Sequence, residues 1–126
     1  MIIVANWKAY VEDIEKAKKL FSVSKRLAKE RVDIVLAPPA PLLGALSAHN
    51  GSRVAFAAQD VSATTGGART GEATAQIFSA AGATYAIIGH SERRTAGDTY
   101  AVVAEKLSHA LAHGLTPILC VGESEC

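Results

Sequence analysis

Five short apolar runs recur along the chain, and each one stops at a proline, a glycine or a polar residue. They do not alternate between apolar and polar side chains, which is typical of strands buried on both faces of a parallel sheet. Segments with helical periodicity separate them, as in repeated βα units. We therefore predict an α/β fold with strands at 2–5, 32–37, 54–58, 85–88 and 117–121. Helices are expected at 12–30, 42–49, 72–81 and 100–113, and a further helix start after 90.

The loops argue against two common nucleotide-binding architectures. A doubly wound dinucleotide-binding domain would carry G-x-G-x-x-G after its first strand, where this chain has Asn6-Trp7-Lys8-Ala9-Tyr10. A P-loop would place a lysine after the glycines of 66–71, where this chain has Glu72-Ala73. Polar residues instead follow the predicted strands directly, which is where a barrel gathers its functional groups. These residues are Asn6, Lys8, Gln59, Asp60, His90 to Arg94, Gly122 and Glu123.

The charge balance gives no sign of a nucleic-acid or membrane partner. Thirteen basic and 12 acidic side chains leave a formal net charge of +1, whereas both partners require a clustered excess of one sign. The apolar N-terminal run is too short for a signal peptide, and prolines interrupt the longest uncharged stretch. We expect one cytoplasmic domain over 1–126, without a membrane span. Cys120 and Cys126 are expected to be reduced thiols, with Cys120 buried and inert.

The turn after the fourth predicted strand carries the main catalytic candidate. Gly89 ends that strand, and His90 follows at a helix start. The positive end of a helix disfavours a charged ring, so a neutral imidazole there could donate a hydrogen bond to a carbonyl oxygen. The alternative is a helix start that merely happens to contain a histidine. Ser91 is suited to cap this helix. Glu92 could pair with a lysine across the strand ends, or be a first-turn acid with no further role.

Two other groups of residues could either bind a ligand or have an ordinary structural role. The Lys8 ammonium could hold a phosphate or a developing oxyanion, and Asn6 could bind a substrate oxygen; a solvated lysine and a turn cap are the alternatives. Glu105, His109 and His113 recur every fourth residue, as metal ligands sometimes do. No fourth ligand is apparent, so we predict no metal site and a solvated or partly packed helix face.

Five motifs occur in a characteristic order and spacing: Asn6-Trp7-Lys8, Ala58-Gln59-Asp60, Thr70-Gly71-Glu72, Gly89-His90-Ser91-Glu92-Arg93-Arg94 and Cys120-Val121-Gly122-Glu123. Together they resemble those of the triosephosphate isomerase family, and the resemblance covers the whole chain. It implies a (β/α)8 TIM barrel, of which 1–126 would be the N-terminal portion. It also implies interconversion of dihydroxyacetone phosphate and glyceraldehyde 3-phosphate through an enediolate, in glycolysis and gluconeogenesis. Neither a cofactor nor a metal is implied, and members of the family are cytoplasmic homodimers.

The resemblance assigns roles to particular residues. His90 would polarise the substrate carbonyl and move protons between its oxygens; this family is the standard example of a neutral histidine electrophile. Lys8 would bind the phosphate and stabilise negative charge, and Asn6 would contact substrate. Ser91 and Glu92 would support these groups from behind, with Glu92 near Lys8.

Two features depart from the family pattern. Thr70, with Arg69 and Gly71, would reach into a neighbouring subunit, but Arg69 stands where the family usually has an aromatic residue. The family's general base is a glutamate on a sixth strand, and neither it nor the lid and later phosphate loops occurs within 1–126. Glu123 belongs to the fifth-strand motif and is not a substitute base. We therefore expect the chain alone to be an inactive fragment. The alternative is a non-catalytic α/β half-barrel that needs a partner chain.

Overall fold

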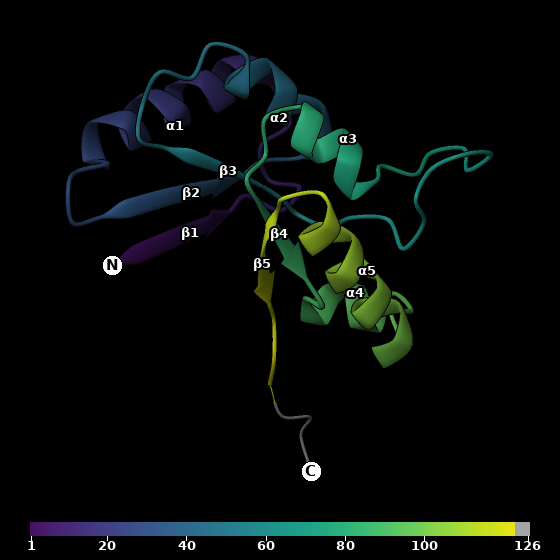
Figure 1. Ribbon diagram of the computed structural model, residues 1–126. Helices are drawn as coiled ribbons and strands as arrows, with labels where there is room; N and C mark the ends of the chain where they lie inside the picture. The colour runs from purple at the N-terminus through teal and green to yellow at the C-terminus, as the bar shows by residue number, and fades with distance from the viewer. Residues whose placement is uncertain (123–126) are drawn as a thin grey trace.

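The computed structural model describes residues 1–122, and five strands form one parallel sheet within that range. They are β1 (Ile2–Asn6), β2 (Asp33–Ala37), β3 (Ala55–Ala58), β4 (Tyr85–Ile88) and β5 (Thr116–Leu119). Each strand pairs with the next in sequence, in the order β1-β2-β3-β4-β5. The sheet curls into half of a barrel (Figure 1). The predicted α/β fold with a parallel sheet is confirmed.

Helices cover the convex side of this half-barrel. Figure 1 shows α1 and α2 over one part of the sheet, and α3, α4 and α5 beside the other. Within residues 1–122, no helix combines the length and the apolar character needed to cross a membrane. The helices are α1 (Ile14–Leu27), α2 (Ala40–Ser47), α3 (Ala75–Ala80), α4 (Ser91–Thr95) and α5 (Tyr100–Ala112).

Three predicted helix starts were wrong, and in two of them a capping side chain sets the observed start. The helix expected from residue 12 begins at Ile14, since the Asp13 side chain is its N-cap and accepts a hydrogen bond from the Lys16 backbone N–H at 2.8 Å. The helix expected from residue 72 begins at Ala75, since the Thr74 hydroxyl is the cap. The helix expected from residue 42 already begins at Ala40, with its proline inside the first turn.

The strands of the middle of the sheet are buried on both faces, as their sequence predicted. Leu36, Phe56 and Ile88 pack towards the helices in the main core. Their neighbours Val35 and Ile87 belong to a smaller cluster on the opposite face. Alternate residues of one strand thus face two apolar surroundings, which explains why these runs show no polar alternation.

The outer strands depart from that prediction. Ile2, Ile3 and Val4 of β1 are 51%, 45% and 37% exposed, so the first apolar run is not buried on both faces. Cys120, which was expected to lie buried inside the fifth strand, follows β5 and is only partly buried. Burial still raises the pKa of its thiol. Cys126 and Glu123 of the fifth-strand motif lie outside the described residues.

Candidate active site

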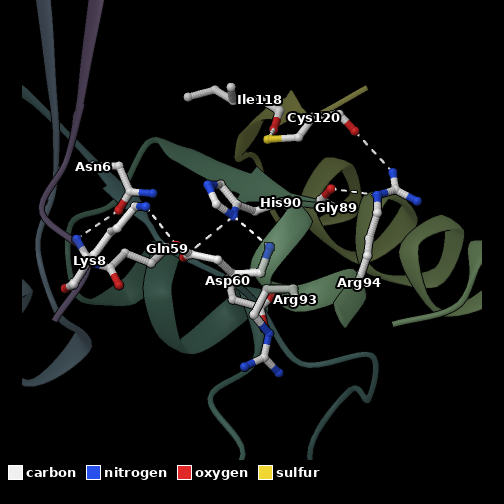
Figure 2. A network of polar contacts seen from close by, with 11 residues as sticks. Asn6, Lys8, Gln59, Asp60, Gly89, His90, Arg93, Arg94, Ile118 and Cys120 are labelled. Atoms are coloured by element: carbon white, nitrogen blue, oxygen red, sulfur yellow. Dashed lines mark hydrogen bonds and ion pairs between the residues drawn. The ribbon is translucent and has the colours of Figure 1, made fainter. Parts of the chain in front are cut away.

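The carboxyl ends of β1, β3 and β4 bring the predicted site residues together. Figure 2 shows Asn6, Lys8 and Gln59 close to His90. Asn6 is the last residue of β1, Gln59 follows β3 directly, and His90 stands two residues after β4. Parallel strands end at the same edge of a sheet, so residues far apart in the sequence meet there. The prediction that Asn6, Lys8 and His90 share one edge is confirmed.

The backbone of Lys8 adopts an uncommon conformation. Its φ of 49° lies in the left-handed region, which a lysine rarely occupies. The Asn6 side-chain oxygen accepts a hydrogen bond from the Lys8 N–H at 2.9 Å. On the other side, the Gln59 amide donates to the carbonyl oxygens of Lys8 and Ala37, each at 2.9 Å. Strained backbone persists where its surroundings hold it, and such positions cluster at functional sites.

The Lys8 ammonium forms an ion pair with Glu92. Lys8 Nζ and Glu92 Oε1 are 2.7 Å apart, across 84 residues of sequence. The hydrogen bond to Glu92 raises the pKa of Lys8, and the same bond lowers the pKa of the Glu92 carboxyl. The predicted pairing of Glu92 with a lysine across the strand ends is confirmed. Both partners remain accessible to solvent, so the Lys8 ammonium is available to a ligand as well as to Glu92.

The imidazole of His90 is itself the N-cap of α4. Its Nδ1 accepts a hydrogen bond from the Glu92 backbone N–H at 3.1 Å. An accepting Nδ1 carries no proton, so in the neutral ring the proton is on Nε2, which can donate. The prediction that Ser91 caps this helix was wrong, because Ser91 already lies in the first turn. His90 has the extended backbone of a cap residue, with φ −56° and ψ 143°.

Arg94 ties the peptide before His90 to the neighbouring strand. Its Nε donates to the Gly89 carbonyl oxygen at 2.7 Å, and its Nη2 donates to the Cys120 carbonyl oxygen at 3.0 Å (Figure 2). One planar guanidinium therefore spans the ends of β4 and β5. The sequence motif contained this arginine, but nothing in it indicated that both acceptors would be backbone oxygens.

A buried charge network beside the site escaped the sequence interpretation. Lys106 of α5 is only 4% exposed. Its Nζ lies 3.0 Å from both Asp60 carboxylate oxygens and 2.6 Å from Asp98 Oδ2. Arg93 Nε completes the network at 3.0 Å from Asp60 Oδ2. A signal existed: Lys106 shares the inward stripe of α5 with Val103 and Ala110, a position where a lysine needs paired carboxylates.

Glu105, His109 and His113, which recur at metal-ligand spacing, lie on α5 and at its C-cap. Within residues 1–122, no group of three His, Cys, Asp or Glu side chains could hold a metal ion. His109 Nε2 instead lies 3.0 Å from the Ala63 carbonyl oxygen, where it contacts the segment after β3. This agrees with the prediction of a partly packed helix face.

A cavity lies beside this edge, and His90 is not part of its lining. It has a volume of about 610 Å³, and its lining includes Asp60, Arg93, Lys106 and the loop residues Arg69 and Gly71. That loop extends from the body of the molecule between β3 and α3 (Figure 1). The three residues predicted for a subunit interface, Arg69, Thr70 and Gly71, are all exposed on it. The structure therefore separates them from the cluster around His90.

The sequence and the structure are both similar to those of known proteins of one family. The family model described as triosephosphate isomerase matches residues 1–126. The chain is similar to the triosephosphate isomerases of Ralstonia nicotianae, at 46% identity, and Cupriavidus pinatubonensis, at 42%; both alignments cover 98% of this chain and 50% of the relative. A crystal structure of triosephosphate isomerase from Bartonella henselae aligns with a TM-score of 0.89 and 30% identity, over 98% of this chain and 52% of that one. The chain spans about half the length of the curated relatives it matches.

Proposed function

Because the chain belongs to the triosephosphate isomerase family, we propose that its residues serve the interconversion of dihydroxyacetone phosphate and glyceraldehyde 3-phosphate. Residues 1–126 would be the N-terminal portion of a single (β/α)8 barrel domain. The observation that carries the proposal is the pair of groups at one sheet edge: the His90 imidazole with Nδ1 engaged, and the Lys8 ammonium bound to Glu92. Both are supported by backbone contacts that fix their orientation.

His90 is the proposed electrophile. The Glu92 backbone N–H occupies Nδ1, which leaves Nε2–H to donate to a carbonyl oxygen of a bound triose. As the enediolate forms, the same nitrogen can pass its proton to one substrate oxygen and recover a proton from the other. A neutral ring suits this shuttle, because a ring protonated at Nδ1 would lose its acceptor for the Glu92 N–H.

Lys8 and Asn6 are the proposed substrate-binding residues. An ammonium near the enediolate oxygens stabilises the negative charge that develops there, and it also attracts the substrate phosphate. Glu92 holds this ammonium in the site and keeps it protonated, consistent with the raised pKa of Lys8. Asn6 already fixes the Lys8 N–H through its oxygen, so its amide nitrogen remains to contact substrate.

The chain by itself is proposed to be inactive. The resemblance places the general base on a sixth strand, and residues 1–126 carry no counterpart of that strand's motif. The test compares this chain with a fusion that continues it with the second half of the Ralstonia nicotianae relative. In a coupled spectrophotometric assay, we expect background turnover from the chain alone and clear turnover from the fusion.

Variants of the fusion test the assigned roles. His90→Gln should lower kcat by about 10²–10⁴, the usual contribution of a positioned acid–base group. Lys8→Met should lower kcat/KM by about 10²–10³, as expected for a lost electrostatic contact. His49→Gln, at an exposed position after α2, is the matched control and should retain activity. A folded fusion without turnover would contradict the proposed function, and His90-dependent turnover by the chain alone would contradict its inactivity.

We further propose that the loop carrying Arg69, Thr70 and Gly71 contacts a second subunit of a cytoplasmic homodimer. Its support is the exposure of these residues on a loop that extends from the body. Arg69 would bring a charge where the family usually has an aromatic residue. Sedimentation of the fusion tests this: a dimer that dissociates more readily in Thr70→Arg is expected, and an unchanged assembly would contradict it.

One observation favours the alternative, a non-catalytic half-barrel that needs a partner chain. The outer strand β1 exposes Ile2, Ile3 and Val4, which suits pairing with another polypeptide. The fusion distinguishes the two proposals. A catalytic half-site gives turnover once the missing strands are supplied, whereas a non-catalytic module gains stability on completion and remains inactive.

A further inference from the structure

The short helix α4 is held in place by polar contacts. None of its five residues, all of which the structure describes, is buried, so apolar packing does not set its orientation. Yet His90 caps this helix, and the Arg93 and Arg94 backbone N–H groups both donate to the His90 carbonyl oxygen, at 2.9 and 3.0 Å. A rotation of α4 would therefore move the imidazole.

Three side chains of α4 connect it to the rest of the molecule, and they differ in strength. Glu92 pairs with Lys8, but both partners are solvent-exposed, and such pairs contribute little to stability. Arg94 holds the Gly89 and Cys120 carbonyl oxygens, so it secures the strand ends before His90. Arg93 is the link from the body of α4 to β3, through Asp60.

The position of Asp60 is fixed by Lys106, whose ammonium contacts both oxygens of the Asp60 carboxylate. Both Asp60 oxygens lie 3.0 Å from the buried Lys106 ammonium, which also contacts Asp98 at 2.6 Å. The Asp98 backbone N–H donates in turn to the Arg93 carbonyl oxygen at 3.0 Å. Two acidic and two basic groups balance in charge around the buried Lys106, while the Arg93 side chain at the outer end of the network is 49% exposed. Arg93 is thus held at two points: its guanidinium contacts Asp60, and its carbonyl oxygen accepts a hydrogen bond from the Asp98 N–H.

We infer that Asp60, held by Lys106, is a positioning residue for His90: through Arg93 it orients α4 so that Nδ1 accepts the Glu92 N–H and Nε2 carries the proton. The importance of this tautomer for turnover rests on the proposed function. The tautomer itself does not, because it can be observed in the chain without substrate. Asp60 and Lys106 touch no reacting atom in this scheme and act only through Arg93.

Nitrogen-15 NMR of the imidazole rings in the 126-residue chain tests the inference. Long-range proton–nitrogen correlations separate protonated from unprotonated ring nitrogens, and His90→Gln assigns the His90 signals among the four histidines. In the parent chain we expect an unprotonated Nδ1 and a protonated Nε2 at neutral pH. Arg93→Met should move the Nδ1 signal upfield and the Nε2 signal downfield, towards a mixture of tautomers.

Two further variants separate positioning from general destabilisation. Arg93→Lys keeps a cation within reach of Asp60 and should largely restore the parent signals. Lys18→Met removes the same charge from an exposed pair on α1, with Glu15 at 3.6 Å, and should leave His90 unchanged. If Arg93→Met does not fold, Asp60→Asn gives the same comparison with an almost isosteric side chain.

The outcomes are distinct. Parent-like His90 signals in a folded Arg93→Met or Asp60→Asn chain would overturn the inference, as would an equal shift in Lys18→Met. A correct tautomer response combined with an inactive fusion would leave the positioning role standing and overturn the proposed function instead.

Discussion

At the scale of single residues, the site depends on unusual backbone positions on both of its sides. Lys8 has a positive φ of 49°, and Gly89, just before His90, has a φ of 73°. Lys8 is itself proposed to act on substrate, and Gly89 directly precedes His90. The two positions differ chemically, because a glycine adopts this conformation without cost whereas a lysine has to be held there by Gln59 and Asn6.

Gly89→Ala should destabilise the chain by more than the backbone strain of a positive φ, because the added Cβ also meets neighbouring side chains. A Cβ there would lie 2.7 Å from Arg94 Nη2 and 3.2 Å from Val103 Cγ1, and Arg94 cannot withdraw without losing its carbonyl partners. Gly114→Ala is the matched control, since its φ is 75° and, among the described residues, no atom lies within 4 Å of the added carbon. We expect a loss of about 1 kcal/mol for Gly114→Ala.

For Gly89→Ala we expect the free energy of unfolding to fall by about 1–3 kcal/mol more than in Gly114→Ala, as is typical of overpacked sites. Urea denaturation followed by circular dichroism measures both free energies of unfolding. Equal losses in the two variants would show that Arg94 does not fill this position in solution.

The Lys8–Glu92 pair should make stability depend on pH at both extremes. The folded-state pKa of Glu92 is lowered, so its contribution is present above the usual carboxyl range and is lost as the pH falls through that lowered pKa. The folded-state pKa of Lys8 is raised, so its contribution is present below the usual lysine range and is lost as the pH rises through the raised pKa.

Glu92→Gln should return the pKa of Lys8 towards the usual lysine value, as measured by an NMR titration of the lysine side chains. Glu15→Gln, which removes an exposed partner of Lys18, should leave Lys8 unaffected. A Lys8 titration that is the same in Glu92→Gln and in the parent chain would rule out the pair.

At the scale of elements, four of the five described helices begin where a side chain accepts a hydrogen bond from a backbone N–H of the first turn, and α2 is the exception. Asp13 does so for α1, Thr74 for α3 and Thr99 for α5, in each case for an N–H three residues later. The imidazole of His90 performs the same task for α4 with a ring nitrogen. A structural cap and a proposed catalytic group are thus one side chain.

Removal of the α1 cap should have a cost of its own. Asp13→Ala leaves the Lys16 N–H without its 2.8 Å partner, and we expect a loss of about 1 kcal/mol in the free energy of unfolding. Asp13→Asn keeps an accepting oxygen and should lose much less. Thermal and urea denaturation of the two variants side by side provide the measurement, and an equal loss in both would indicate that charge rather than capping is responsible.

Element order could be predicted from the sequence because apolar runs and helical stripes are local signals. The strand at 85–88 was placed correctly, whereas the first residues of α1 and α3 were not, because capping depends on geometry that several nearby residues could supply. The start of α2 was misplaced because its proline lies inside the first turn and does not precede the helix. Serine is a more common N-cap residue than histidine, yet the N-cap of α4 is His90 and Ser91 is the first residue of the helix. The residues alone left open whether Glu92 pairs with a lysine, and the family resemblance placed it near Lys8. The Lys106 network was not predicted, because a helix lysine is normally solvated.

At the scale of the whole molecule, the half-barrel leaves an apolar edge on β1. Within residues 1–122, β2 is the only strand paired with it, and Ile2, Ile3 and Val4 are exposed. An open edge with apolar side chains promotes pairing between chains, and a lysine on such an edge opposes it. The chain as given should therefore associate with itself as its concentration rises.

Ile3→Lys should weaken this association by about tenfold, which corresponds to about 1.4 kcal/mol. Sedimentation velocity over a concentration series measures it. Leu111→Lys introduces the same charge at a 60% exposed position on α5 and should change association little. Equal effects of the two substitutions would point to net charge, and not to the β1 edge, as the cause.

The order of strands in the sheet also has a consequence in time. Every described strand after β1 pairs with the one that precedes it in sequence, so each of these later strands leaves the ribosome after its partner has been made. The strands begin at residues 2, 33, 55, 85 and 116, and at synthesis rates of about 5–20 residues per second each would follow its partner by roughly 1–6 seconds. The half-barrel can therefore grow outward from β1 during translation, one unit at a time.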